Sequence, residues 1–549
     1  MILEPIRVSD EHRTEHTIND RHSMNTRSPL RSVLSAIPEG LFAFFCGLLF
    51  FVSPVVAATP FEKQLSRVED KLSQIKMDVL RLYQSRAAGS DRPPLPSSLR
   101  APESPVSGRN DQKSGVPLPE EPDLKEIAAM MNRLELGAAP SRGTAPLPTD
   151  ELRLLLAQYF IQAELIVQAE QTLKNLAIQT RREPIAAEAW FQLEKIYYRK
   201  GDYQQALGAF YKIPAKGGQP LRHEATYLAG NSYLYLKDYL KAIELLNKIG
   251  EGSDFYPFAL YSSGLSYLNL GDAWSSTQQQ FQKLIAFNPG EDPILQELIN
   301  KTRVTLGFAF IDQKRYPEAL AVFEPVPTQS RYRPQARFGI GQAHIGSEDC
   351  VKAIVVLKGL IQQHPTRPYA LEARLHIANC YSKLSAYRRA VDSYQDALKA
   401  YSARLEDLKK LSQRIQTTNL ESWLSRPGSQ PSEGGPRLVS LEQDLAIERG
   451  YPELMRVYAD WFRLNDQIAK LTRQGMDKTI QKSDAEAMQD SGSLPIRMQG
   501  VRRDLIELLR SAVTDQLQSK MEQMDERVLR ANIGIAKNLA RTQSHETAP

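Results

Sequence analysis

The chain has 549 residues, a formal net charge of +5 and 42% hydrophobic residues. A charge this small, spread over this length without a clustered basic stripe, argues against a nucleic-acid-binding protein. The composition otherwise agrees with that of a soluble protein.

The first distinctive segment is Leu41–Ala58, which runs for eighteen residues without a charge. Arg27 and Arg31 precede it, and the small residues Ala57 and Ala58 end it. A basic region, an apolar region and a small-residue cleavage site follow one another in this order in a secretory signal peptide. The sequence therefore predicts export, with cleavage after Ala57 or Ala58.

Residues 1–58 are thus interpreted as an N-terminal extension and signal peptide, with translation expected to begin at Met24. The alternative is an uncleaved anchor, because the apolar segment is just long enough to span a bilayer, although Pro54 would interrupt it. Both interpretations place residues 59–549 across the membrane. In a Gram-negative bacterium the compartment would be the periplasm, with the chain either released or anchored in the inner membrane and facing it.

A regular heptad pattern follows, over residues 59–85. Apolar residues recur at alternating spacings of four and three, at Phe61, Leu65, Val68, Leu72, Ile75, Val79 and Leu82. A seam this narrow is typical of a coiled coil, and one this short needs association to persist as a helix. We therefore predict a homo-oligomer joined through residues 61–82. The alternative is an amphipathic helix that lies on the repeats or on the membrane surface.

Residues 86–148 are rich in proline, serine and glycine. Such a segment has too little apolar surface to bury, which predicts a disordered linker. One short helix, residues 123–136, is expected to interrupt it.

The most informative stretch of the chain is Ala189–Ile213. Two helices joined by a turn at Gly201, with apolar sides facing each other, account for its spacing of Trp190, Leu193, Tyr197, Gly201, Tyr203, Ala206 and Phe210. The pattern resembles the tetratricopeptide repeat (TPR), whose signature is W-x2-L-G-x2-Y followed by A-x3-F in a unit of about 34 residues. The resemblance implies a stack of helix pairs, because one unit cannot bury its own apolar face.

Copies of this unit extend over residues 149–400. A small residue at the helix–helix contact recurs at steps of 37, 36, 35, 42, 34 and 37 residues, at Ala169, Ala206, Ala242, Thr277, Ala319, Ala353 and Ala390. The glycine of the first helix, which lets neighbouring helices approach closely, recurs as Gly230, Gly264, Gly307 and Gly341. The predicted fold is all-α, a TPR-type α-solenoid of about seven helix pairs.

Some units depart from the family pattern. Glu194 and Ala378 replace the glycine, and His344 stands where tyrosine is usual. The fourth unit carries a one-residue insertion near Trp274. These departures loosen individual units without changing the predicted fold.

Residues 401–545 lack the repeat motif but keep helical stripes of apolar residues. One stripe continues the last repeat helix to Ile415, a second surrounds Trp461, and a third runs from Leu517 to Ile535. The expected structure is a C-terminal arm of long, coiled-coil-like helices, which would cap the open end of the solenoid.

Two cysteines remain after the signal segment, Cys350 and Cys380. The repeat pattern places them at similar heights on successive helices, so a disulfide is geometrically feasible, and export would permit it. The alternative is two small buried apolar side chains.

Catalytic motifs are absent from the sequence. No G-x-x-x-x-G-K-[ST], H-E-x-x-H or G-x-S-x-G segment occurs, and the histidines show no ligand spacing. We therefore expect no enzyme activity, no cofactor and no metal site.

The TPR resemblance implies that the first helices line a concave groove that takes a peptide or a partner helix. Residues at groove-facing positions are Phe191, Lys195, Tyr198, Tyr227, Asn231, Tyr235, Tyr261, Phe338 and Asn379. Rigid aromatic side chains give a large contact area at low entropic cost. The alternative is that several of these rings pack against neighbouring helices.

The order of signal, heptad segment, linker and repeats is similar to that of the periplasmic TPR proteins that accompany the Tol–Pal system and bind TolA. It implies a non-catalytic envelope scaffold that serves a Tol- or TonB-type system. One alternative is a scaffold for polysaccharide export or outer-membrane assembly. Another is an accessory of a cell-wall enzyme or a peptidoglycan-binding protein.

Overall fold

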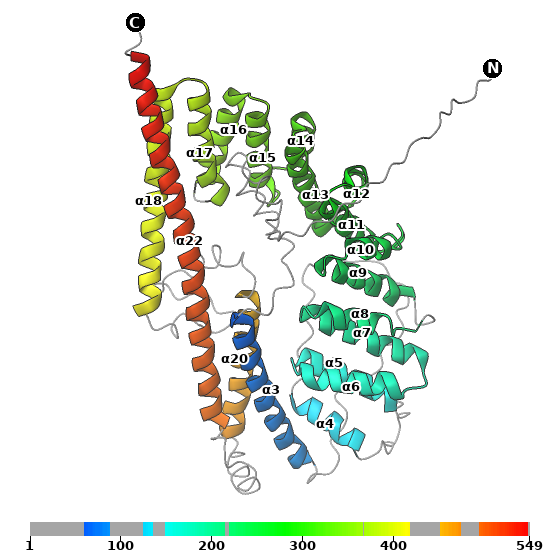
Figure 1. Ribbon diagram of the computed structural model, residues 1–549. Coiled ribbons are helices and arrows are strands. Elements are labelled where there is room, and N and C mark those ends of the chain that lie inside the picture. Colours follow the sequence, from blue (N-terminus) through cyan, green and yellow to red (C-terminus); the bar gives the residue numbers. More distant parts are fainter. Residues whose placement is uncertain are drawn as a thin grey trace, which may run out of the picture. The chain divides into compact units, whose positions relative to one another are not determined.

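The computed structural model describes residues 60–87, 124–135, 149–214, 219–365, 367–417, 451–473 and 494–546. All of them belong to one unit of the chain, Val55–Pro549. Helices make up all the regular structure of these ranges (Figure 1). None of the described helices is long and apolar enough to cross a membrane. The predicted signal segment and most of the predicted linker lie outside the described residues.

Seven helix pairs follow one another along the chain, as the repeat pattern predicts. They are α5 (Thr149–Gln162) with α6 (Ile166–Gln179), α7 (Glu183–Arg199) with α8 (Tyr203–Phe210), α9 (Gln219–Tyr235) with α10 (Tyr239–Leu246), α11 (Tyr256–Leu270) with α12 (Trp274–Ile285), α13 (Pro293–Asp312) with α14 (Tyr316–Phe323), α15 (Arg333–Gly346) with α16 (Cys350–Gln363), and α17 (Pro368–Lys383) with α18 (Tyr387–Thr417). The predicted all-α fold of repeated TPR-type pairs is confirmed.

The small residue of each second helix is buried at the helix–helix contact. All six alanines of the series are fully buried, and Thr277 is 1% exposed. The turn within each pair contains one residue in the left-handed conformation: Glu164, Gly201, Lys237, Gly271, Lys314, Glu348 and Ser385. Each lies five residues before the buried small residue, except Gly271, which lies six before Thr277. The extra residue is the predicted insertion near Trp274.

The glycines of the first helices are required by the large side chain one turn beyond the buried small residue. A Cβ on Gly230 would lie 2.6 Å from Cγ of Leu246, and one on Gly307 would lie 2.5 Å from the Phe323 ring. Gly264 and Gly341 are covered in the same way by their own second helices. The first and second helices of these units therefore approach more closely than any side chain would permit.

Glu194 occupies the glycine position of the second unit and is fully buried. Neither of its carboxylate oxygens has a hydrogen-bond partner among the described residues. Burial raises its pKa to about 9, and the neighbouring Glu224 acts in the same direction, while Lys195 opposes both. A carboxyl group in this state is neutral at physiological pH.

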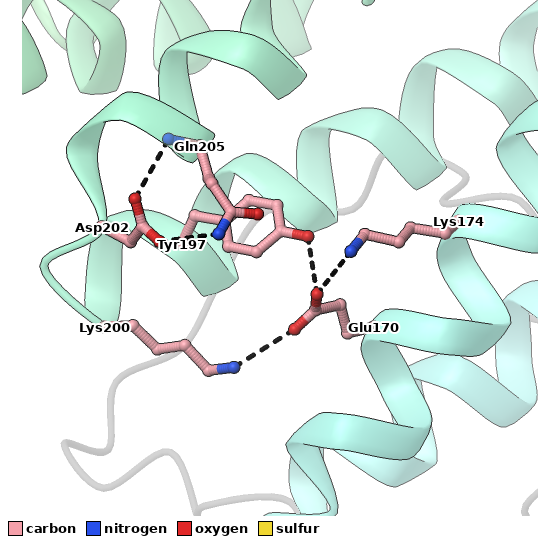
Figure 2. Close-up of polar contacts among 6 residues, drawn as sticks. All are labelled: Glu170, Lys174, Tyr197, Lys200, Asp202 and Gln205. Carbon is pink, nitrogen blue, oxygen red and sulfur yellow. Dashed lines mark hydrogen bonds and ion pairs between the residues drawn. The ribbon is translucent and has the colours of Figure 1, made fainter.

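Polar side chains join successive pairs. Figure 2 shows Glu170 of α6, which accepts hydrogen bonds from Lys174 (2.6 Å) and from the Tyr197 hydroxyl of the next unit (2.8 Å). Lys200 donates to its second oxygen at 3.2 Å. Burial alone would raise the pKa of Glu170, but the three donors together hold it below its ordinary value. The tyrosine of the repeat signature thus bonds to the preceding second helix.

The heptad segment forms α3 (Pro60–Ala87), and its seam is filled by helices of the same chain. It packs against α4 (Leu124–Glu135), α20 (Tyr451–Arg473) and α22 (Leu494–Glu546). Five seam residues are at most 6% exposed: Leu65, Val68, Leu72, Ile75 and Val79. The prediction that they join copies of the chain is therefore corrected, because their apolar surface is already covered. The side chain of Leu82 lies outside the described set.

Ion pairs accompany this packing. Lys76 is 4% exposed, and its ammonium contacts Asp460 of α20 at 2.7 Å and the carbonyl of Ala163 at 2.5 Å. Asp78 pairs with Arg497 of α22 at 2.6 Å. One lysine therefore joins α3, the C-terminal arm and the turn of the first unit.

The C-terminal arm contacts the last repeat. Helix α22 runs beside α18 (Figure 1), and α20 is fixed to α22 by the Trp461 indole, which donates to the Met498 carbonyl at 2.9 Å.

Cys350 and Cys380 are both buried and unlinked, which agrees with their interpretation as small buried side chains. Burial, together with the neighbouring Cys350, raises the pKa of Cys380 to about 12.

Candidate partner-binding surface

The first helices of successive pairs contact one another from α5 through α7, α9, α11, α13 and α15 to α17. We call the surface that they form the first-helix face. All nine predicted groove residues lie on these helices, on α7, α9, α11, α15 and α17. Their surroundings differ, and the difference decides which of them can meet a partner.

Two of the predicted aromatic residues are buried. Phe191 is 2% exposed and Phe338 is fully buried. The ring of Phe338 lies 5.6 Å from the rings of both Tyr369 and His376 of the next unit. The prediction that these two rings are open to a partner is therefore wrong, because they fill the space between neighbouring helices.

The predicted polar residues are occupied by contacts within the chain. Lys195 pairs with Glu224 of the next unit at 2.9 Å and lies over the Phe191 ring. Asn231 is 5% exposed and donates to the Tyr227 carbonyl at 2.9 Å. These two side chains are therefore not free to bind a ligand. Asn379 alone is exposed, and it accepts a hydrogen bond from the Tyr394 hydroxyl.

The remaining predicted rings, Tyr198, Tyr227, Tyr235 and Tyr261, are half-buried and lie in two groups. The first group also includes Tyr203, which begins the second helix α8 and was not predicted as a groove residue. Tyr203 and Tyr235 stack with centroids 4.7 Å apart, and Tyr198 lies edge-on to both, at 5.7 and 6.2 Å. We call these three residues the tyrosine cluster. Burial raises the pKa of Tyr198 far above its ordinary value, and Tyr235 adds to the effect. Each ring is held in place by the other two while part of its surface stays accessible.

A second group of rings begins at Tyr227, the next aromatic residue on this face. Its ring lies 5.6 Å from Phe255 and 6.3 Å from Phe258. Tyr261 follows in the fourth unit, with Lys301 of α13 4.7 Å above its ring. The apolar part of the first-helix face therefore extends over the second to the fifth units.

Lys301 and Asp312 are charged residues of this face that were not predicted. They stand in α13 at the repeat positions of Glu224 and Tyr235 in α9. Burial, together with the nearby Arg331, lowers the pKa of Lys301. Burial raises the pKa of Asp312 to about 6, although its side chain keeps contact with solvent. Counting charged residues at all face positions, and not only aromatic ones, would have found both.

The side chains of this surface can make contact with a partner. In the ranges that the structure describes, no group of three histidine, cysteine or acidic side chains could hold a metal ion. Accessible rings, one solvated carboxyl group and a covering lysine can bind an apolar segment that carries a charge.

No family model matches the chain, and no curated protein matches it. Solved structures that align with it include a tetratricopeptide repeat protein from Parabacteroides merdae, with 17% identity, 45% of this chain and 91% of that one covered, and a TM-score of 0.32. The apo form of RapI aligns with 13% identity, coverage of 64% and 94%, and a TM-score of 0.38. The TPR2AB domain of yeast Sti1, in its complex with pHSP90, aligns with 14% identity, coverage of 46% and 90%, and a TM-score of 0.19. Because these TM-scores are low, the fold is assigned from the seven helix pairs of this structure.

Proposed function

We propose that this chain is a non-catalytic scaffold of the cell envelope that binds protein partners through its first-helix face. The tyrosine cluster carries the proposal. Three rings that support one another lose little conformational freedom when a partner covers them, so the contact area that they offer is gained at low cost. Tyr227, on the same helix as Tyr235, and Tyr261 of the fourth unit continue the surface.

The partner that fits this surface is an apolar peptide or helix with a basic side chain. Asp312 supplies the reason, because burial raises its pKa and no cation of the described residues opposes that shift. It is also the last residue of α13, where the helix dipole disfavours a negative charge. A basic residue of a partner would relieve both effects.

The envelope compartment rests on residues 41–58, whose pattern is that of a signal peptide. A Tol- or TonB-type system is the proposed setting, from the order of signal, helix, linker and repeats. The covered seam of α3 removes one element of that resemblance, so the proposal depends on the signal pattern and the repeats. A fusion of alkaline phosphatase after residue 85, expressed in a Gram-negative host, should be active only if the chain is exported. An inactive but stable fusion would contradict the compartment.

Site-specific photo-crosslinking tests the binding surface. A photo-reactive phenylalanine analogue at Tyr235 or Tyr227 should capture a defined partner in the native cell. The matched control is the same analogue at Leu240, which is 69% exposed on the second helix of the same unit. Equal capture from Leu240, or none from either tyrosine, would contradict binding at the first-helix face.

A further inference from the structure

A cleft of about 540 Å³ opens among the last three repeat helices, away from the tyrosine cluster. Its walls come from α16, α17 and α18, and its charged lining residues are Lys358, Arg374, Arg389, Asp392 and Asp396. This volume lies within the range of about 300–1,000 Å³ that is typical of ligand pockets.

The seventh unit carries charged residues where the second unit carries a covered ring. In the second unit Lys212 lies over the Trp190 ring at 4.6 Å. In the seventh unit Arg374 stands at the position of Trp190 and Asp396 at that of Lys212, and both line the cleft.

The guanidinium of Arg374 has also lost the acceptor that its counterpart uses. In the sixth unit, Arg337 donates from Nη1 to Oε1 of Gln363 at 2.6 Å. The residue that corresponds to Gln363 in the seventh unit is Ala400, which offers no side-chain acceptor. The buried Nε of Arg374 has no hydrogen-bond partner in the described part of the chain. Because protein covers this nitrogen, an acceptor that enters the cleft would contact the terminal nitrogens of the Arg374 guanidinium.

The charges around the cleft define the acceptor. Arg374, Lys358 and Arg389 contribute three positive charges, one from each helix, and Asp392 and Asp396 contribute two negative ones. Lys358 donates to the Tyr381 hydroxyl at 3.1 Å. The resulting single positive charge suits one carboxylate, whereas the two aspartates would repel a polyanion.

We propose that this cleft binds the carboxylate of one acidic side chain of a partner polypeptide, with Arg374 as the main donor. The apolar lining residues Ile361 and Ile377 take an apolar residue next to that acid. This contact lies on a different part of the repeats from the first-helix face, so it is a second point of attachment and its test is independent of the first.

The proposal is tested by measuring the binding of two capped tripeptides to residues 55–549 of the chain. Ligand-observed NMR should detect acetyl-Leu-Glu-Leu-amide at millimolar concentration. The peptide with glutamine in place of glutamate should bind at least about tenfold more weakly, because a charge-assisted hydrogen bond contributes about 1.5–3 kcal/mol. Equal binding of the two peptides, or binding of neither, would overturn the proposal.

Variants place the contact. Arg374→Gln should lower the affinity for the glutamate peptide by a similar factor, and Arg389→Gln should lower it less. Arg337→Gln is the matched control, because that guanidinium already has its acceptor in Gln363, and it should leave peptide binding unchanged. An undiminished affinity of both Arg374→Gln and Arg389→Gln would place the peptide elsewhere and overturn the assignment. Thermal melts of each variant confirm that the repeats stay folded.

Discussion

The ring of Tyr394 in α18 lies against Gly534 in α22 so closely that a Cβ on the glycine would overlap it. Tyr394 stands at the repeat position of Phe323, which lies in the same way against Gly307 of its own unit and Gly339 of the following first helix. Gly534 therefore corresponds to Gly339, and α22 takes the place of the first helix of an eighth unit. The arm covers the apolar end of the repeats with the same contact that joins one repeat to the next.

This contact predicts opposite effects of one substitution at two glycines of α22. Gly534→Ala should lower the free energy of unfolding by about 1–3 kcal/mol, because the added methyl group has no room. Gly500→Ala should raise it by about 0.5–1 kcal/mol, since nothing lies near its Cβ position and alanine favours the helix. Urea denaturation of both variants measures the difference. A stabilised Gly534→Ala would mean that α22 does not cap the repeats in solution.

Glu194 predicts a pH-dependent loss of stability. Its folded-state pKa of about 9 lies above the ordinary glutamate pKa of 4.5, so the folded chain holds a proton that the unfolded chain releases between these two pH values. Stability from this group is full below pH 4.5 and falls as pH rises towards 9, by at most roughly 1.4 kcal/mol per pH unit.

Glu194→Ala should therefore remove this slope and raise the melting temperature at pH 8. Ala378, which is fully buried at the same repeat position, shows that alanine fits there. Glu188→Ala, at a half-buried acid of the same helix, is the control and should keep the slope. Calorimetry between pH 5 and 9 provides the measurement, and an unchanged slope in Glu194→Ala would rule the explanation out.

Two turns within the helix pairs have a lysine with a positive φ, Lys237 and Lys314. Glycine at such a position should stabilise the chain. Lys314 has a φ of 58°, a conformation that costs a non-glycine residue about 1 kcal/mol or more. Lys314→Gly should thus stabilise the chain by up to about 1 kcal/mol in chemical denaturation. Gly201→Ala, at φ 75° in open space, should destabilise it by a similar amount. The same sign for both substitutions would contradict this account.

The buried pair of Lys76 and Asp460 predicts a large cost for removing one partner. Asp460→Ala leaves an ammonium in an apolar junction and should destabilise the contact of α3 by about 3–5 kcal/mol. Glu406→Ala breaks a solvent-exposed pair with Lys410 and should leave stability almost unchanged, because water screens the attraction between exposed charges. Amide hydrogen exchange of α3 provides the measurement, and exchange should become faster in Asp460→Ala only. If the amides of α3 stay protected in Asp460→Ala, the ion pair does not hold α3 in place.

The repeats could be predicted from the sequence because each unit is specified by contacts within about 20 residues. The spacing from Gly230 to Ala242 and Leu246 encodes one helix–helix contact, and it recurs wherever that contact does. The accessibility of a groove ring is decided by the next unit. Phe191 and Tyr227 share a repeat position, yet only the first is fully covered.

The α3 helix illustrates a different limit. Its heptad pattern correctly indicates that another helix covers Leu72 and Ile75, but a periodic seam carries no information on which chain supplies that helix. Here α4 of the same chain supplies part of the cover, and the other two covering helices, α20 and α22, begin at Tyr451 and Leu494. The ion pair of Lys76 with Asp460 is equally invisible to a local pattern.

Helix α22 is fixed near both of its ends. Arg497 and Asp504 pair with Asp78 and Lys71 of α3, which is itself tied to the first unit through Lys76 and Ala163. About 45–55 Å further along, Gly534 lies against the last unit. Helix α22 therefore connects the first unit, through α3, to the last unit. The distance between the two ends of the repeats can increase only if one of these two contacts of α22 breaks.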